Sequence, residues 1–213
     1  MAIYEYGNSD APVVLIQPAD AHDLSEMNDE TAEIKRLTEQ PFRLLCASVD
    51  DWNRDLSPWE APAVFGSVGF GGRAGETLAA ILKLCTDPDK RYFLGGYSLA
   101  GLFALWAGLQ TDVFSGIAAA SPSVWFPGFV EYLQTHKMQS PQVYLSLGDR
   151  EAKTRNQTMA RVADCIVQCE TILTAQGKIC TLEWNPGNHF KDPGLRTAKA
   201  FAWLLNHIGE DGK

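Results

Sequence analysis

Short apolar runs alternate with longer amphipathic runs along the whole chain. The apolar runs are bounded by Pro, Gly, Asp or Asn, which is typical of strands buried in a parallel sheet. The predicted strands are residues 12–17, 41–49, 92–95, 114–120, 143–147 and 179–184. The predicted helices are residues 24–39 with Asp23 as N-cap, 74–85, 99–110, 126–135, 155–176 and 195–208. This alternation predicts an α/β fold, in which helices cover both faces of a mostly parallel sheet.

Composition narrows the class of protein. The chain has 213 residues, of which 46% are hydrophobic and 21% charged, so we expect one soluble domain over residues 1–213. The net charge of -8 argues against a nucleic-acid partner. Residues 1–10 lack the pattern of a signal peptide, and no apolar run approaches the roughly 20 residues that span a bilayer. We therefore expect a cytoplasmic protein without a membrane partner.

The five cysteines indicate reduced thiols. They are scattered, odd in number and mostly embedded in apolar runs, which favours core packing in a cytosolic protein over a disulfide framework. Cys165 and Cys169 share a face of a predicted helix, but no His or Cys stands near them in the sequence to complete a metal site. We expect neither a metal nor a cofactor.

In open parallel sheets, active sites form at the carboxyl ends of the strands. The loops at that edge are predicted at residues 18–23, 50–72, 96–99, 121–125, 148–156 and 186–191. The third of these belongs to the stretch Gly-Gly-Tyr-Ser-Leu-Ala-Gly at 95–101, between a strand and a helix. This is the pattern of a nucleophile elbow, with Ser98 as nucleophile. Gly96 and Ala100 are small, and a larger side chain at either position would clash across the turn. The usual pattern has a second glycine where this chain has Ala100.

A serine hydroxyl needs a base, and the chain has four histidines. His189 follows the last predicted strand and precedes the last helix, which is where an α/β-hydrolase carries its histidine. His136 and His207 are near helix ends and are interpreted as surface or capping residues. His22 comes before the serine in the chain. We expect His189 to be the base.

The acid should follow the preceding strand, which gives the order serine, acid, histidine. Two carboxylates compete in the segment Leu-Gly-Asp-Arg-Glu at 147–151. Glu151 lies three residues after Gly148, a spacing common among hydrolase acids, and is favoured. Asp149 remains the alternative. The acid would hold the tautomer of His189 and stabilise its protonated form.

The oxyanion formed on acyl attack needs N–H donors. The N–H of Leu99, directly after the nucleophile and at a helix N-terminus, is one candidate. The second should follow the first predicted strand. Because Pro18 has no N–H, Ala19 or Asp20 must supply it.

These motifs, together with Ser-Pro-Ser-Val-Trp at 121–125 and Gly-Asn-His at 187–189, resemble the putative-esterase family of siderophore trilactone esterases and esterase D type enzymes. The resemblance covers residues 90–205 well and the earlier part loosely. It implies an α/β-hydrolase fold with a three-layer arrangement, no metal, and ester hydrolysis through an acyl-enzyme on Ser98. The chain offers no insertion long enough for a large cap domain.

Three residues are candidates for substrate binding. Trp125 belongs to a segment whose family counterpart lines the site, and Tyr97 stands beside the nucleophile. Arg54, in the long loop 50–72, could bind an anionic group. The alternative, slightly favoured, is that Trp52 and Trp59 pin this loop and that Arg54 pairs with a neighbouring aspartate. The glycine-rich run 66–72 lacks a Walker lysine and the dinucleotide spacing, which disfavours nucleotide binding.

The sequence thus predicts a serine hydrolase that cleaves a small-molecule carboxylic ester without a cofactor. Acyl transfer to an alcohol and thioester hydrolysis use the same residues and stay open. A binding protein on a degenerate hydrolase scaffold is the alternative from another class.

Overall fold

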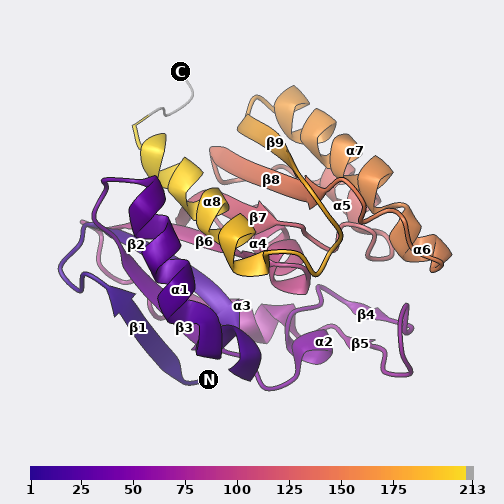
Figure 1. The fold of residues 1–213 in the computed structure, drawn as a ribbon, viewed down its shortest axis with the longest axis horizontal. Helices are drawn as coiled ribbons and strands as arrows, with labels where there is room; N and C mark the ends of the chain where they lie inside the picture. The colour runs from indigo at the N-terminus through magenta and orange to yellow at the C-terminus, as the bar shows by residue number, and fades with distance from the viewer. Residues whose placement is uncertain (210–213) are drawn as a thin grey trace.

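The computed structural model describes residues 1–209 as a seven-stranded sheet between two helical layers (Figure 1). The strands of this sheet are β1 Ile3–Gly7, β2 Val13–Ala19, β3 Arg43–Ser48, β6 Arg91–Tyr97, β7 Phe114–Ala120, β8 Gln142–Gly148 and β9 Ile179–Asn185. The helices are α1 Ala21–Leu37, α2 Trp52–Asp55, α3 Ala74–Leu82, α4 Leu99–Gln110, α5 Phe129–Thr135, α6 Gln157–Ala160, α7 Val162–Ala175 and α8 Pro193–Asn206. None of the described helices is long and apolar enough to cross a membrane.

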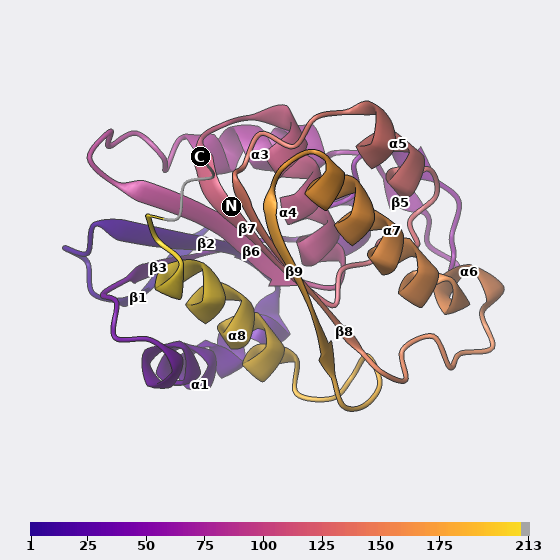
Figure 2. The same ribbon diagram turned by 90° about the horizontal axis from the view of Figure 1, so that it is seen from above.

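The strand order is β1-β3-β2-β6-β7-β8-β9, and every neighbouring pair is parallel except β1 with β3. Parallel strands need crossover helices, which the sequence supplies between them. Helices α1 and α8 cover one face of the sheet, and α3, α4, α5 and α7 cover the other (Figure 2). The expected α/β fold with a mostly parallel sheet is therefore confirmed, and the described residues form no separate cap domain.

Two predicted helices have different boundaries in the structure. Helix α1 begins earlier, because Asp20 rather than Asp23 is its N-cap. The Asp20 carboxylate accepts the N–H groups of His22 and Asp23 at 2.8 and 2.9 Å. Asp23 instead stands at N3 and accepts the N–H of Asp20, which completes a capping box. The predicted helix 155–176 is two helices, α6 and α7, which are separated at Arg161.

Two regions of the chain contain elements that escaped the sequence prediction. The edge strand β1 is mostly exposed, so it lacks the apolar signature of the buried strands. The segment 50–72 is not wholly irregular, because it contains α2 and a hairpin of β4 Glu60–Ala61 and β5 Phe70–Gly71. Trp59 fixes this segment, since its indole N–H donates to the Pro127 carbonyl at 3.0 Å. This hydrogen bond favours the alternative in which the tryptophans hold the loop in place.

Helix α8 packs directly beneath the end of β6. A Cβ placed on Gly95 would lie 2.7 Å from the Phe201 ring and 2.6 Å from Ala118 Cβ, so only glycine allows this approach. The Phe201 side chain is fully buried. This contact packs α8, the helix that follows His189, against β6, the strand that precedes Ser98.

We expect Phe201→Ala to lower the free energy of unfolding by about 3–5 kcal/mol, because it leaves a cavity between α8 and the sheet. The matched change Phe190→Ala removes a ring that is 86% exposed. It should alter the free energy of unfolding by less than about 0.5 kcal/mol. Urea unfolding of both variants measures the difference, and equal losses would contradict the packing described here.

Candidate active site

Four adjacent strands bring the candidate residues to one edge of the sheet. Ser98 follows β6, the segment 121–125 follows β7, Glu151 follows β8, and His189 follows β9. Because these strands are parallel neighbours, their carboxyl ends meet at the same edge. Residues separated by up to 91 positions in the chain are thereby placed in hydrogen-bonding contact.

Ser98 occupies a sharp turn between β6 and α4. Its φ of 56° lies in the left-handed region, which is rare for a residue with a Cβ and is typical of a nucleophile elbow. The turn closes tightly, since a Cβ on Gly96 would lie 2.6 Å from the Ala100 methyl group. Because Gly96 has no Cβ, the turn has room for the methyl group of Ala100.

A continuous chain of hydrogen bonds joins serine, histidine and acid. The Oγ of Ser98 lies 3.0 Å from Nε2 of His189, and Nδ1 of His189 lies 2.7 Å from Oε2 of Glu151. The Glu151 side chain is only 3% exposed and that of His189 is 25% exposed. The buried carboxylate accepts a hydrogen bond from Nδ1–H, which leaves Nε2 free to accept the proton of the Ser98 hydroxyl.

The second oxygen of Glu151 is held by three further donors. Its Oε1 accepts the Gly148 N–H at 2.7 Å, the Ser121 hydroxyl at 2.8 Å and the Arg196 guanidinium at 2.7 Å. Burial alone would raise the pKa of this carboxyl. The hydrogen bond from His189, with those from Gly148 and Ser121, instead lowers the pKa below its ordinary value. Glu151 is therefore held as a carboxylate in the orientation that faces His189.

Sequence reasoning missed Arg196. This arginine of α8 is almost completely buried, and its Nη1 also contacts the Ser121 and Tyr97 hydroxyls at 3.1 and 3.2 Å. Its Nη2 donates to the Pro186 and Asn188 carbonyls in the loop that carries His189. A single guanidinium thus binds the acid and fixes the histidine loop. An arginine in an amphipathic helix gave no sequence signal that it faces inward.

Asp149 and Tyr97 also hold the histidine loop. The Asp149 carboxylate accepts the Gly187 N–H at 2.7 Å, so it contacts the loop backbone and not His189. The structure therefore brings Glu151, and not Asp149, to the imidazole. The Tyr97 hydroxyl donates to the His189 carbonyl at 2.7 Å, and the two rings lie 5.1 Å apart. Tyr97 thus contacts the histidine, and its expected role in substrate binding stays a prediction.

The two candidate oxyanion donors have different surroundings. Leu99 is the first residue of α4, and the Ser98 side chain does not cap that helix. The Ala19 carbonyl accepts from Val49 on the β3 side of β2. In a parallel strand the N–H and C=O of one residue point to the same side, so the N–H of Ala19 faces away from β6. This orientation disfavours Ala19 as a donor, and the Asp20 N–H already donates to Asp23.

Trp125 is buried close to the elbow. It packs against Phe65 and Phe70, with ring centroids 6.1 and 6.3 Å away, and lines a cavity of about 270 Å³ beside α7. Ser123, two residues earlier, is the part of this segment that contacts Ser98. A role of Trp125 in substrate binding stays a prediction.

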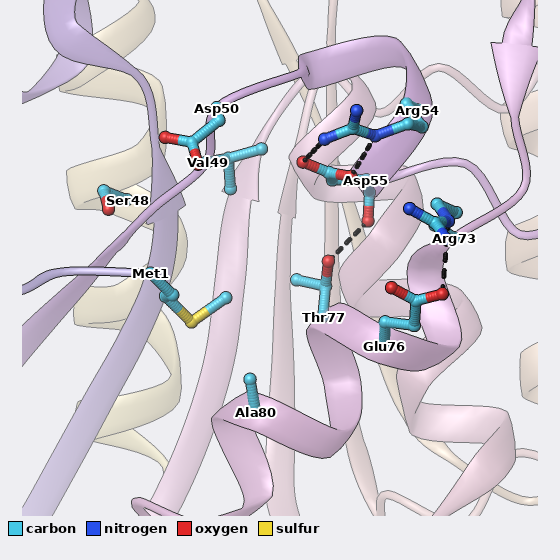
Figure 3. Close-up of a pocket in the computed structure, with 10 residues that line it drawn as sticks. All are labelled: Met1, Ser48, Val49, Asp50, Arg54, Asp55, Arg73, Glu76, Thr77 and Ala80. Carbon is cyan, nitrogen blue, oxygen red and sulfur yellow. Dashed lines mark hydrogen bonds and ion pairs between the residues drawn. The ribbon is translucent and has the colours of Figure 1, made fainter.

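Arg54 lies in a different cavity. It lines a hollow of about 240 Å³ between the end of β3 and α3, and neither Ser98 nor His189 lines that hollow (Figure 3). Its guanidinium donates to both carboxylate oxygens of Asp55, at 2.8 and 3.2 Å, which raises the pKa of Arg54. The pairing of Arg54 with a neighbouring aspartate, which the sequence slightly favoured, is therefore confirmed, and it disfavours Arg54 as a substrate-binding residue.

The remaining histidines and the cysteines lie elsewhere. His136 and His207 are the C-caps of α5 and α8, as expected. All five cysteines are free, and Cys165 and Cys169 are buried on the packed face of α7. Over residues 1–209, no group of three or more His, Cys, Asp or Glu side chains is arranged to hold a metal ion.

Solved structures share this fold. An IroE-like serine hydrolase from Shewanella oneidensis aligns with a TM-score of 0.70 at 16% identity, over 96% of this chain and 75% of that one. The enterochelin esterase from Shigella flexneri aligns with a TM-score of 0.62 at 17% identity, over 94% of this chain and 53% of that one. The enterobactin hydrolase IroE in complex with DFP aligns with a TM-score of 0.61 at 15% identity, over 97% and 88% of the two chains.

These similarities show that this chain has the same α/β fold as the three proteins. The chain spans about half of the length of the Shigella enterochelin esterase. No protein-family model and no curated protein sequence matches the chain.

We expect Arg196→Met to lower the free energy of unfolding by about 3–5 kcal/mol at pH 7, because it leaves the buried Glu151 carboxylate without its charged partner. The stability that Glu151 gains from a lowered pKa is present above the ordinary value of 4.5 and is lost as the pH falls through the folded-state pKa. As the pH falls below about 4.5, protonation of Glu151 removes the charge that the Arg196 guanidinium compensates, so the difference between Arg196→Met and the wild type should shrink.

Urea unfolding between pH 3.5 and pH 8 (roughly the window that this linkage requires) checks the prediction. Arg150→Met is the matched control, since its guanidinium is 68% exposed and lies 4.0 Å from Asp149. That variant should lose less than about 0.5 kcal/mol. A loss at Arg196 that does not depend on pH would show that packing, and not charge, is responsible.

Proposed function

We propose that this protein is a serine hydrolase that cleaves carboxylic esters through an acyl-enzyme on Ser98. The observation that carries the proposal is the hydrogen-bonded chain Ser98–His189–Glu151 at a strained elbow. A buried carboxylate, an imidazole with one free acceptor nitrogen and a serine hydroxyl in this order are the parts that acyl transfer needs.

In the first half of the reaction, Ser98 Oγ attacks the ester carbonyl and its proton passes to Nε2 of His189. The N–H of Leu99 stabilises the oxyanion, aided by the N-terminus of α4. As the carbon–oxygen bond to the alcohol breaks, His189 returns the proton to the leaving oxygen. Glu151 keeps the ring oriented and compensates its positive charge, but stays ionised.

In the second half, water attacks the acyl-enzyme with His189 as base. The tetrahedral intermediate collapses, the bond to Ser98 Oγ breaks, and the proton moves from His189 to Ser98. Every step uses only water and groups of this chain, so the proposal includes neither metal nor cofactor.

The structural neighbours support an ester as substrate. Those reported above are a serine hydrolase, an enterochelin esterase and an enterobactin hydrolase, the last bound to DFP. Because these neighbours have low sequence identity to this chain, they support the class of reaction and not any one substrate. The contacts of Ser98 suit acyl transfer and thioester hydrolysis equally well, since the acceptor and the leaving group depend on the substrate pocket. We further propose that the protein acts in the cytoplasm on a small molecule.

We expect Ser98→Ala to abolish hydrolysis of p-nitrophenyl acetate and butyrate, because the nucleophile is lost while the fold is kept. Steady-state rates of the wild type and the variant, with circular dichroism as the control for folding, measure this. The variant should fall by at least about 10³-fold towards the uncatalysed rate. Equal rates in the two proteins would refute the proposed mechanism.

A fluorophosphonate label separates an enzyme from a binding protein on the same scaffold. An activated serine reacts with this probe, whereas an unactivated one does not. Labelling of the wild type and not of Ser98→Ala is expected. An unlabelled wild type would favour the binding protein.

A further inference from the structure

Ser123 points its side chain at the nucleophile. The residue follows β7, is only 2% exposed, and places its Oγ 3.3 Å from Ser98 Oγ. Within residues 1–209 its hydroxyl has no other hydrogen-bond partner. A buried hydroxyl normally satisfies its hydrogen bonds with neighbouring protein groups, so a sole contact with the reacting oxygen needs an explanation.

The direction of this hydrogen bond follows from counting protons. Nδ1 of His189 carries a hydrogen, because the carboxylate of Glu151 beside it can only accept. Nε2 then has no hydrogen, and the single hydroxyl hydrogen of Ser98 must be donated to it. Ser123 is therefore the donor to Ser98 Oγ.

The backbone fixes Ser123 in this position. Its N–H donates to the Ser98 carbonyl at 3.0 Å, and its own carbonyl accepts the Phe126 N–H at 2.9 Å. The preceding Pro122 packs on the first turn of α4, where a Cβ on Gly101 would lie 3.2 Å from it. Both the main chain and the side chain of Ser123 thus contact the nucleophilic residue, and the backbone contacts hold the Cα of Ser123 beside Ser98.

We propose that Ser123 is a further catalytic residue, whose hydroxyl donates to Ser98 Oγ and stabilises the negative charge that develops on that oxygen. This inference rests on the function proposed above. In the attack, the charge develops as the proton leaves Oγ for His189 and the bond to the acyl carbon forms. In deacylation, it develops as the bond between the acyl carbon and Oγ breaks, before His189 returns the proton. Ser123 keeps its own proton in both halves.

The hydrogen bond is longer than the usual 2.7–2.8 Å between two hydroxyl oxygens. A charged acceptor draws its donor closer and strengthens the bond roughly twofold. The contact is therefore worth more in the transition state than in the resting enzyme, and this difference is what accelerates a reaction. The loss of Ser123 should consequently appear in kcat and leave KM almost unchanged.

The test compares Ser123→Ala, Ser123→Thr and Ser140→Ala with the wild type. We expect Ser123→Ala to lower kcat for p-nitrophenyl butyrate and the rate of fluorophosphonate labelling by about tenfold, with KM within about twofold. Ser123→Thr keeps the hydroxyl and should recover most of both rates. Ser140→Ala removes another buried hydroxyl, near the opposite end of β8, and should match the wild type.

Each outcome decides the matter. A Ser123→Ala enzyme as fast as the wild type, a change in KM alone, or a Ser123→Thr enzyme as slow as Ser123→Ala would overturn the role of the hydroxyl while the proposed function stands. A wild type that neither labels nor hydrolyses esters would overturn both. Thermal unfolding of the three variants shows whether a slow variant is folded.

Discussion

The buried contact between Arg196 and Glu151 is the constraint on which the rest of the site depends. A carboxylate that is only 3% exposed would be costly to keep ionised on its own. The guanidinium at 2.7 Å compensates its charge, and the same guanidinium binds two carbonyls of the loop that carries His189. Acid and base are therefore placed by one residue of α8, which is anchored in turn by Phe201 against Gly95.

This arrangement explains why the sheet order matters for chemistry. The four strands β6, β7, β8 and β9 are neighbours, and each ends in a segment that contributes residues to the site. The segment after β7 serves both ends of the chain of hydrogen bonds. Ser121 donates to Glu151, and Ser123 two residues later reaches Ser98. A parallel sheet thus converts four distant loops into one hydrogen-bonded network.

The sequence predicted best those features of the site that depend on nearby residues in the chain or on the order of the strands. The elbow around Ser98 follows from steric limits on a tight turn, and those limits select small residues within two positions. The positions of Glu151 and His189 follow from the order of strands. Arg196 could not be predicted, since its burial depends on the packing of helix α8 against strands β6, β7 and β8. Ala19 was expected as an oxyanion donor because counting along a loop does not reveal which way an N–H points. Arg54 was a candidate for substrate binding, but the alternative that the sequence slightly favoured, its pairing with a neighbouring aspartate, is the arrangement in the structure.

The central claim is that Glu151, held by Arg196, orients His189 for its work on Ser98, while the nearby Asp149 only fixes the loop. The most direct measurement is the second-order rate of fluorophosphonate labelling for the wild type, Glu151→Gln and Asp149→Asn, each shown to be folded by circular dichroism. The account predicts that labelling of Glu151→Gln is slower by at least about a hundredfold, while Asp149→Asn stays within about threefold of the wild type. Equal rates for Glu151→Gln and the wild type, or the larger loss in Asp149→Asn, would contradict it.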